Sequence, residues 1–215
     1  MEIFLDTADV QAVEDRLSTG IISGITTNPT LIKKSGRDPA KVYADLISLG
    51  ITDLSVEVVG GINEMITTGQ MYYSQFGHPV TVKVPCSIEG LKACKTLSAK
   101  GIRVNVTLVF SPSQAILSSL AGATYISPFV GRMDDNSLQG LGLINDISNI
   151  LKPHNSSTKV LAASIRDVQS VSKAFQLGAD VCTIPPTVFD KMFNHVLTDK
   201  GIKQFEHDTN SVTVF

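Results

Sequence analysis

Glycine recurs just ahead of short apolar, β-branched runs, and this rhythm constrains the fold more than any other feature of the sequence. The glycines concerned stand at positions 20, 50, 77, 101, 122 and 178. Gly178 follows Phe175 and Leu177, a pattern typical of a helix that ends on a left-handed residue, which glycine adopts without strain. One such glycine is missing between 122 and 178, and the Pro-His-Asn sequence at 153–155 predicts a turn there instead. The chain is therefore expected to alternate helices and strands.

Eight apolar runs are predicted to be strands, and helical spacing fills the segments between them. The runs cover residues 2–5, 21–26, 54–58, 80–84, 102–109, 123–127, 159–163 and 181–184. Units of this size fit a closed (β/α)8 barrel. An open doubly wound sheet is the alternative, but it normally has a glycine-rich turn after its first strand, where this chain has Asp6-Thr7-Ala8-Asp9. We predict an α/β fold, a single-domain (β/α)8 TIM barrel over residues 1–215, with an additional C-terminal helix at 199–209.

Two helix starts carry a capping residue followed by proline, which is tolerated at the first helical position because its missing N–H has no intrahelical acceptor there. They are Asp38-Pro39 and Ser111-Pro112. Helical spacing then predicts which side chains face the core: Val42, Leu46 and Leu49 after the first start, and Ala115, Ile116 and Leu120 after the second.

Composition and charge exclude several classes of protein. The chain is 43% hydrophobic and 18% charged, which is typical of a folded domain rather than a disordered chain or a coiled coil. Eighteen basic and twenty acidic residues argue against a nucleic-acid partner, and the apolar runs are too short to cross a membrane. The N-terminus does not resemble a signal peptide, and the three cysteines form no CxxC pair, so we expect a cytoplasmic protein.

Polar residues stand near the C-terminal ends of strands that should otherwise be apolar on both faces. In a TIM barrel that end carries the active site, so these residues are the candidates for chemistry. Seven of the eight predicted strands contribute at least one; in chain order they are Asp6, Thr26, Thr27, Asn28, Glu57, Lys83, Asn105, Thr107, Ser127, Ser164 and Arg166.

Lys83 is the sharpest of these candidates, because it lies among valines in Val80-Thr81-Val82-Lys83-Val84. A charged ammonium group there would lose most of its hydration, and burial favours the neutral amine. A neutral amine is a nucleophile that condenses with a carbonyl to form a Schiff base. The alternative is a structural lysine that reaches solvent or pairs with Glu57, and for an isolated lysine this is the better interpretation. Six other strand ends that supply polar groups shift the balance toward the chemical interpretation.

The other polar residues suggest supporting roles. Asp6 and Glu57 are candidates for the general acid and base that Schiff-base chemistry needs, although either could merely neutralise Lys83. Thr107 and Asn105 point the same way along one strand and could hold a water and substrate hydroxyls. Their structural alternative is ordinary strand and turn propensity.

Two arginines on adjacent segments of the same rim suggest a phosphate clamp. Arg132 follows the sixth strand in a predicted loop and Arg166 follows the seventh, with Ser164 beside it. Guanidinium groups match phosphate oxygens, although each arginine could instead pair with a neighbouring aspartate. The four histidines are scattered without ligand spacing, and the sequence has no HExxH motif and no Walker loop, so we expect neither a metal nor another cofactor.

Taken together, these blocks resemble the transaldolase family, specifically its short-chain branch, which also contains the fructose-6-phosphate aldolases. The resemblance spans nearly the whole chain and depends on six blocks in order: Phe4-Leu5-Asp6-Thr7-Ala8, Gly24-Ile25-Thr26-Thr27-Asn28-Pro29-Thr30, Val82-Lys83-Val84-Pro85, Asn105-Val106-Thr107-Leu108-Val109-Phe110, Ser127-Pro128-Phe129-Val130-Gly131-Arg132-Met133-Asp134 and Ala162-Ala163-Ser164-Ile165-Arg166.

The resemblance implies transfer of a dihydroxyacetone unit from a ketose phosphate (sedoheptulose 7-phosphate or fructose 6-phosphate) to an aldose phosphate (glyceraldehyde 3-phosphate or erythrose 4-phosphate), as in the pentose phosphate pathway. It implies that Lys83 forms the Schiff base, that Asp6 moves the proton of carbon–carbon cleavage, and that Glu57 and Thr107 hold a water. The implied substrate ligands are Asn28, Asn105 and Ser127 for the dihydroxyacetone hydroxyls and Arg132, Ser164 and Arg166 for the phosphate, with Phe129 beside them.

Two positions separate the branches of this family. The similar fructose-6-phosphate aldolases carry glutamine where this chain has Glu57, and tyrosine where it has Phe129. Both positions therefore favour a transaldolase over the alternative, an aldolase that releases free dihydroxyacetone. A third hypothesis is a non-catalytic sugar-phosphate binder.

The resemblance also implies a homo-oligomer, a decamer or pentamer, in which the C-terminal helix reaches a neighbouring subunit. The short apolar tail at 210–215 departs from the family pattern.

Overall fold

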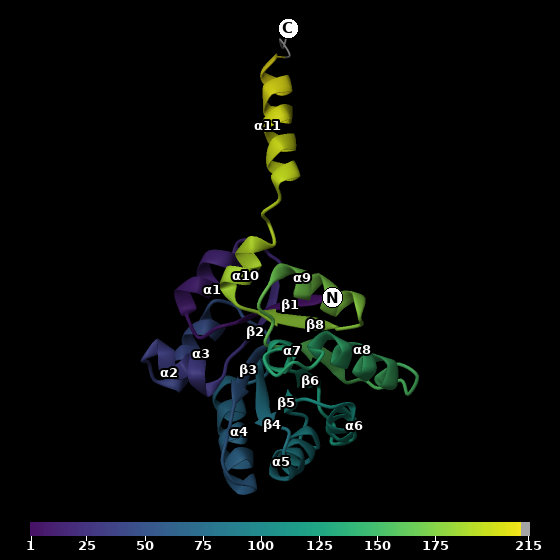
Figure 1. Ribbon diagram of the computed structural model, residues 1–215. Helices are drawn as coiled ribbons and strands as arrows, with labels where there is room; N and C mark the ends of the chain where they lie inside the picture. Colours follow the sequence, from purple (N-terminus) through teal and green to yellow (C-terminus); the bar gives the residue numbers. More distant parts are fainter. Residues whose placement is uncertain (212–215) are drawn as a thin grey trace.

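Eight parallel strands close into a barrel in the computed structural model, which describes residues 1–211 (Figure 1). Each strand pairs with its neighbours in sequence, and β8 pairs with β1 to complete the ring. The strands are β1 (Glu2–Asp6), β2 (Ile22–Thr26), β3 (Leu54–Glu57), β4 (Val80–Pro85), β5 (Arg103–Val109), β6 (Tyr125–Pro128), β7 (Lys159–Ala162) and β8 (Val181–Ile184). The predicted (β/α)8 TIM barrel is confirmed, with all eight strands in the expected places.

Helices alternate with these strands and surround the barrel (Figure 1). Three of them are short additions after β2, β6 and β8, and one of these, α7, occupies the segment after β6 that was predicted to be a loop. The helices are α1 (Val10–Leu17), α2 (Pro29–Ser35), α3 (Pro39–Ser48), α4 (Ile62–Phe76), α5 (Ile88–Ser98), α6 (Pro112–Leu120), α7 (Val130–Asp134), α8 (Gly140–Leu151), α9 (Val168–Gln176), α10 (Pro186–Lys191) and α11 (Val196–Ser211).

The local signals act as their chemistry predicts. The Asp38 side chain accepts a hydrogen bond of 3.1 Å from the backbone N–H of Lys41 and begins α3. Gly178 has φ +100°, a left-handed conformation that a residue with a Cβ adopts only with strain. Asn155, with φ +49°, makes the turn in the segment that lacks a glycine.

The predicted inner face of α6 is wrong in part. Ala115 is buried, but Ile116 and Leu120 are 39% and 71% exposed. Helical spacing shows which side chains share a stripe, and the packing of the helix on the barrel decides which stripe is covered. On α3, by contrast, Val42 and Leu46 are fully buried as expected and Leu49 is partly buried.

A buried polar cluster fills the opposite, N-terminal end of the barrel. The Asp53 carboxylate accepts hydrogen bonds from Thr81 (2.8 Å), Tyr125 (2.8 Å) and Arg103 (2.7 Å). Burial raises the pKa of Asp53, and these three partners oppose that shift. The cluster joins four strand regions at the bottom of the barrel, away from the end where the sequence places the candidate chemistry.

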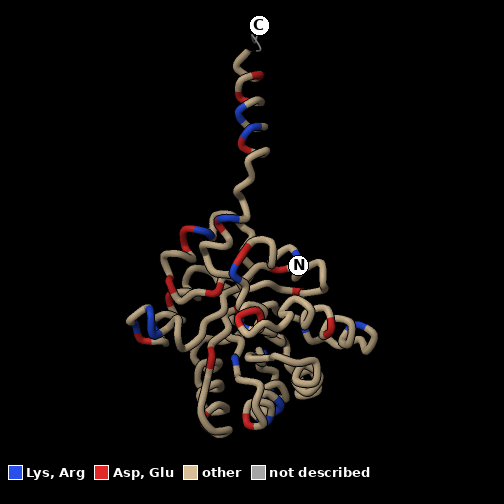
Figure 2. Tube along the Cα trace, in the orientation of Figure 1, with Lys and Arg blue, Asp and Glu red and all other residues tan. Residues whose placement is uncertain are grey.

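The C-terminal helix α11 extends away from the barrel (Figure 1), and none of its residues is buried. It confirms the predicted helix at 199–209 and adds three residues before it and two after it. The last part of the apolar tail, residues 212–215, lies outside the described residues. Basic and acidic residues are interspersed along the chain trace (Figure 2). No helix within residues 1–211 combines the length and apolar character that a membrane span requires.

Candidate active site

A small cavity of about 130 Å³ opens at the C-terminal end of the barrel and contains most of the predicted site. Its lining comes from β1, β2, β4, β6 and β8, from α7, and from residues just after β2, β6 and β7. The lining residues are Asp6, Thr26, Asn28, Lys83, Ser127, Phe129, Arg132, Ala163, Ser164 and Thr183.

Lys83 reaches this cavity from inside the barrel and is only 4% exposed. Its Nζ lies 2.9 Å from a carboxylate oxygen of Glu57 and donates a hydrogen bond of 3.0 Å to the backbone carbonyl of Thr27. The side chain of Lys83 therefore neither reaches bulk solvent nor packs unpaired among valines. The side chain is buried, its Nζ is held by two hydrogen-bond acceptors, and it borders a cavity. Its surroundings therefore agree both with a structural pair to Glu57 and with a reactive amine.

Strand register explains why these side chains meet. Glu57 on β3 lies opposite Lys83 on β4, and Lys83 lies opposite Asn105 on β5. When side chains at paired positions of neighbouring strands both point into the barrel, they lie little farther apart than the strands themselves. Three predicted site residues thus form one row across three strands.

Asp6 enters the cavity from β1, opposite Thr26 in the register of β2. Its Oδ1 accepts a hydrogen bond of 2.7 Å from the Thr26 hydroxyl. Burial raises the pKa of the Asp6 carboxyl above its ordinary value of 3.8, against the lowering effects of the Lys83 charge and the Thr26 hydrogen bond. A carboxyl with a raised pKa beside a cavity is suited to accept and return a proton.

The residues expected to bind substrate hydroxyls lie at different depths. Ser127 lines the cavity and donates a hydrogen bond of 2.7 Å to the amide oxygen of Asn105, which is itself fully buried beneath it. The Asn105 amide nitrogen donates to the hydroxyl of Ser55. Asn28 also lines the cavity, and its side-chain oxygen caps α2 by accepting from the backbone N–H of Leu31.

Thr107 stands two residues beyond Asn105 on the same strand and is fully buried. Its hydroxyl has no hydrogen-bond partner within residues 1–211. Buried hydroxyls are nearly always bonded, so this group fits a site that receives a water or a substrate hydroxyl. Leu108, which follows it, has φ +59°, and the β5–β6 register shifts between Val106 and Val109.

The predicted phosphate clamp is divided between two adjacent hollows. Arg132 lines the cavity, with its guanidinium carbon 4.9 Å from the centre of the Phe129 ring. Arg166 lines a neighbouring hollow of about 220 Å³ and makes a two-pronged ion pair with Asp135. Ser164 borders both hollows and has φ +58°, an uncommon conformation for a residue other than glycine and one that clusters at functional sites.

Two polar residues of the cavity carry no role in the sequence-based hypothesis. They are Thr26, noted only as a polar strand end, and Thr183. The eighth strand, which was thought to contribute no polar group, therefore does contribute one. The sequence did contain a signal for this residue, because side chains alternate along a strand. In Val181-Cys182-Thr183-Ile184, Thr183 points to the same side as Val181, so the strand carries a polar side chain near its C-terminal end.

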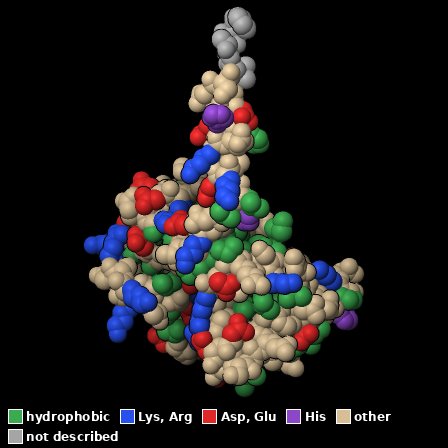
Figure 3. All heavy atoms as spheres, turned by 45° about the horizontal axis from the view of Figure 1, so that its top comes forward, with side chains coloured by type: hydrophobic (Ala, Val, Ile, Leu, Met, Phe, Trp, Pro, Cys, Tyr) green, Lys and Arg blue, Asp and Glu red, His purple; other side chains and the backbone are tan. Residues whose placement is uncertain are grey.

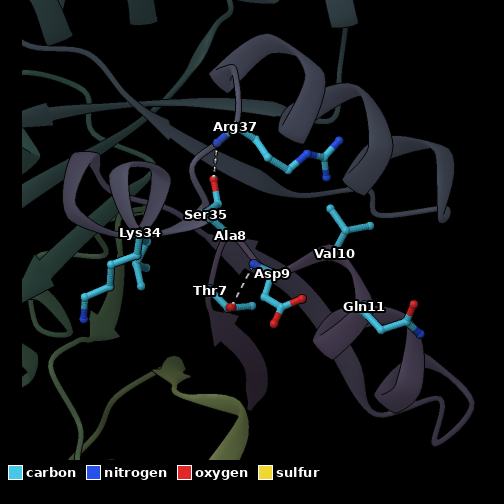
Figure 4. Close-up of a pocket in the computed structure, with 9 residues that line it drawn as sticks. Thr7, Ala8, Asp9, Val10, Gln11, Lys34, Ser35 and Arg37 are labelled. Carbon is cyan, nitrogen blue, oxygen red and sulfur yellow. Dashed lines mark hydrogen bonds between the residues drawn. The ribbon is translucent and has the colours of Figure 1, made fainter.

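A larger cavity of about 680 Å³ lies beside the site, between the start of α1 and α2. It is lined by polar and charged groups that include Asp9, Lys34 and Arg37 (Figure 4). The Lys34 side chain extends away from the other two charged groups, and Arg37 pairs with Asp45. The smaller cavity is the candidate site because it holds the buried amine and the carboxyl with the raised pKa.

Nearly the whole sequence is similar to known proteins. Residues 3–214 match the family described as Transaldolase/Fructose-6-phosphate aldolase. This chain belongs to that family. A probable transaldolase of Caulobacter sp. (strain K31) is 46% identical over 208 residues, which is 97% of this chain and 96% of the relative. A probable transaldolase of Paracoccus denitrificans (strain Pd 1222) is 47% identical over 209 residues, with the same coverage of both chains.

Membership of the transaldolase/fructose-6-phosphate aldolase family makes this chain an enzyme of the transaldolase and aldolase type. The predicted resemblance is therefore confirmed. Within residues 1–211, histidine, cysteine, aspartate and glutamate side chains form no group of three or more that could hold a metal ion.

Proposed function

We propose that the chain is a transaldolase that carries a dihydroxyacetone unit on Lys83 between a ketose phosphate and an aldose phosphate. The observation that carries this proposal is the environment of one amine. Lys83 Nζ is buried, lies 2.9 Å from Glu57 and faces the cavity that Asp6 also lines. A nucleophile, a proton acceptor beside it and a second carboxyl across a cavity are the groups that Schiff-base chemistry requires.

The first step joins the amine to the donor. Glu57 takes a proton from the Lys83 ammonium, and the neutral amine adds to the C2 carbonyl of the ketose. A nitrogen–carbon bond forms, and the carbonyl electrons move to oxygen. That oxygen takes up one proton from the nitrogen and the proton held by Glu57 and leaves as water, while the nitrogen lone pair closes the carbon–nitrogen double bond. The product is an iminium ion on Lys83. The hydroxyl of Thr107, which has no hydrogen-bond partner within residues 1–211, supports a place for this water at β5, the strand beside that of Lys83.

The second step breaks the carbon–carbon bond. Asp6 removes the proton of the C4 hydroxyl, whose O–H electrons become the new carbonyl bond of the departing aldose. The C3–C4 bond breaks, and its electrons move toward the iminium nitrogen to give an enamine on Lys83. Addition of this enamine to an acceptor aldehyde reverses these movements, and Asp6 returns its proton to the new hydroxyl.

The charged groups at the β6 and β7 side support binding of the distal phosphate. Arg132 and Ser164 border the cavity, and Arg166 lies in the adjacent hollow on the other side of Ser164. Asp135 already holds the Arg166 guanidinium in two-pronged geometry, the geometry with which arginine also binds phosphate. A phosphate bound by Arg166 therefore has to share or displace Asp135.

A coupled assay tests the proposed reaction. Fructose 6-phosphate and erythrose 4-phosphate are supplied together, and triose phosphate is monitored. The proposal expects triose phosphate beyond one equivalent of enzyme only when the four-carbon acceptor is present. Continued formation of triose phosphate without an acceptor would identify an aldolase, and ligand binding without any product would identify a sugar-phosphate binder.

Phe129 is the structural feature that favours transfer over release. Its ring lines the cavity beneath Arg132 and has no group that can donate a proton to the enamine. We expect Phe129→Tyr to raise the release of free dihydroxyacetone by about tenfold, because the phenol supplies a general acid. Enzymatic assay of dihydroxyacetone measures the effect, with Phe110→Tyr as the control, since Phe110 packs against Phe129 at 6.0 Å between ring centres. Equal release by the wild type and Phe129→Tyr would contradict the expectation.

We also propose, from the family resemblance, that the chain forms a homo-oligomer. The support is the exposed α11, in which Ile202 and Phe205 are 50% and 72% exposed. Hydrophobic side chains also gather where this helix leaves the barrel (Figure 3). Such a helix is suited to pack on another subunit. Sedimentation at several concentrations is expected to give a mass well above the 23.0 kDa of one chain, and a monomer throughout would contradict the proposal.

A further inference from the structure

Two threonine hydroxyls form a row that ends on the candidate proton-transfer group. The Thr183 hydroxyl oxygen on β8 lies 2.6 Å from that of Thr26 on β2, and the Thr26 hydroxyl lies 2.7 Å from Oδ1 of Asp6 on β1. Both threonines are buried, with exposures of 3% and 2%. All three residues line the cavity that contains Lys83.

Counting protons fixes the direction of this row. A threonine hydroxyl has a single proton to donate, and an ionised carboxylate can only accept. Thr26 therefore gives its proton to Asp6 Oδ1, so the hydrogen bond between the two threonines has to be donated by Thr183. With its oxygen satisfied in this way, the Thr26 hydroxyl stays turned toward Asp6.

The direction of the row decides which oxygen of Asp6 exchanges a proton. Oδ1 faces a donor, so it remains an acceptor whether Asp6 is ionised or neutral, unless both hydroxyls turn round together. The proton that Asp6 accepts then resides on Oδ2. We propose that Thr183 is a positioning residue that acts through Thr26, keeping Oδ1 of Asp6 occupied and Oδ2 available to substrate.

This inference rests on the proposed role of Asp6 in carbon–carbon cleavage, and it adds a residue that the family resemblance did not assign. It also predicts a pH effect. Other charged groups that act on Asp6 or share its cavity are Lys83, Glu57 and Arg132, and none of them changes when Thr183 is replaced. Loss of a donor that strengthens the Thr26 hydrogen bond weakens the support of the ionised carboxylate, so the pKa of Asp6 rises further.

The informative variant is Thr183→Val, which keeps the shape of the side chain and removes the hydroxyl. We expect kcat for transfer to fall about fivefold with KM little changed, as for the loss of one buried hydrogen bond. We expect the acidic limb of the pH profile of kcat/KM to move to higher pH. Thr183→Ser, which keeps the hydroxyl, is expected to restore both quantities, and Thr183→Ala to reproduce the valine result.

Thr158→Val is the matched control. Thr158 is also a buried threonine, and its hydroxyl lies 2.8 Å from the carbonyl oxygen of Ala123 and 3.2 Å from the hydroxyl of Ser119, but it precedes β7 at the other end of the barrel. Its replacement is expected to lower stability without moving the acidic limb. An unmoved limb in Thr183→Val and Thr183→Ala would overturn the inference, and so would an equal loss of kcat in Thr183→Ser, because both results indicate simple packing.

A second measurement separates this inference from the proposed function. The carboxyl carbon of Asp6, labelled with carbon-13 and assigned by Asp6→Asn, can be titrated by NMR without substrate. A higher titration midpoint of Asp6 in Thr183→Val supports the positioning role of Thr183. The proposed function is tested separately, by borohydride reduction of the enzyme with fructose 6-phosphate. If the wild type forms no reduced adduct at Lys83, the proposed function alone is refuted. An adduct in both proteins with identical midpoints would leave the function standing and refute the role of Thr183.

Discussion

Lys83→Met is expected to abolish transfer, lowering kcat by on the order of 10⁴-fold or more, because methionine has no amine to form the Schiff base. Borohydride reduction in the presence of fructose 6-phosphate is expected to attach a stable three-carbon or six-carbon adduct to Lys83 in the wild type and none in the variant. Peptide mass spectrometry locates the adduct. An unmodified Lys83 in wild-type enzyme during turnover would refute the proposed chemistry.

The loss of activity has to be separated from a loss of folding. Lys83→Met leaves the Glu57 carboxylate, whose side chain is only 10% exposed, without its partner at 2.9 Å. Removing one member of a buried ion pair typically costs about 3–5 kcal/mol of the free energy of unfolding. The double variant Lys83→Met/Glu57→Gln is therefore expected to recover much of the stability and none of the activity.

A lysine at the other end of the barrel provides the matched control. Lys159 begins β7 and pairs with Glu2, and its side chain is 43% exposed. Lys159→Met is expected to retain both transfer activity and the adduct at Lys83. Equal losses in the two lysine variants would show that the effect comes from general destabilisation of the barrel.

Asp6→Asn is expected to lower kcat about 10²–10⁴-fold, because the amide keeps the shape of the side chain but cannot accept the substrate proton. The Thr26 hydroxyl can still donate to the amide oxygen, so the local hydrogen bond survives. Adduct formation at Lys83 is expected to persist, since the amine and Glu57 are untouched. Steady-state transfer assays and mass spectrometry of the reduced enzyme measure the two effects, and unchanged kcat would contradict the assigned role.

The same substitution is expected to stabilise the fold at neutral pH. Burial raises the pKa of Asp6 in the folded state above its ordinary 3.8, which is the value in the unfolded chain. Between the unfolded pKa and the higher folded pKa, the folded protein therefore binds more protons than the unfolded chain. Stability is therefore lost as pH rises through this window, and an asparagine at position 6 does not suffer that loss. The free energy of unfolding of Asp6→Asn should exceed that of the wild type at pH 7, and the gap should narrow toward pH 4.

Urea unfolding of both proteins at several pH values measures this difference. Asp9→Asn is a suitable control, because Asp9 is an exposed cap of α1. It is expected to lower stability slightly rather than raise it, because it removes a negative charge from the N-terminus of α1. A wild type that is more stable than Asp6→Asn at pH 7, or a gap independent of pH, would contradict the sign of the predicted effect.

The sequence alone predicted the barrel because its signals are local. The glycine at 178 and the caps at Asp38 and Ser111 act within a few residues of where they stand, and each forms the helix boundary expected of it. It also predicted Lys83 as the central residue, because a lysine among valines is anomalous wherever the strand is placed. The exposed stripe of α6 and the short helix α7 were not predicted, since they depend on how neighbouring elements pack.

Only the tertiary structure decided which of the site residues contact one another. It joined Lys83 to Glu57, separated Arg166 from the cavity by pairing it with Asp135, and brought Thr183 to Thr26 across 157 positions of the chain. Closure of the barrel pairs β8 with β1, so the last strand supplies a hydroxyl next to the first two strands. Local propensities act over one helix turn or one strand, whereas these contacts arise from strand register and ring closure, which no single segment contains.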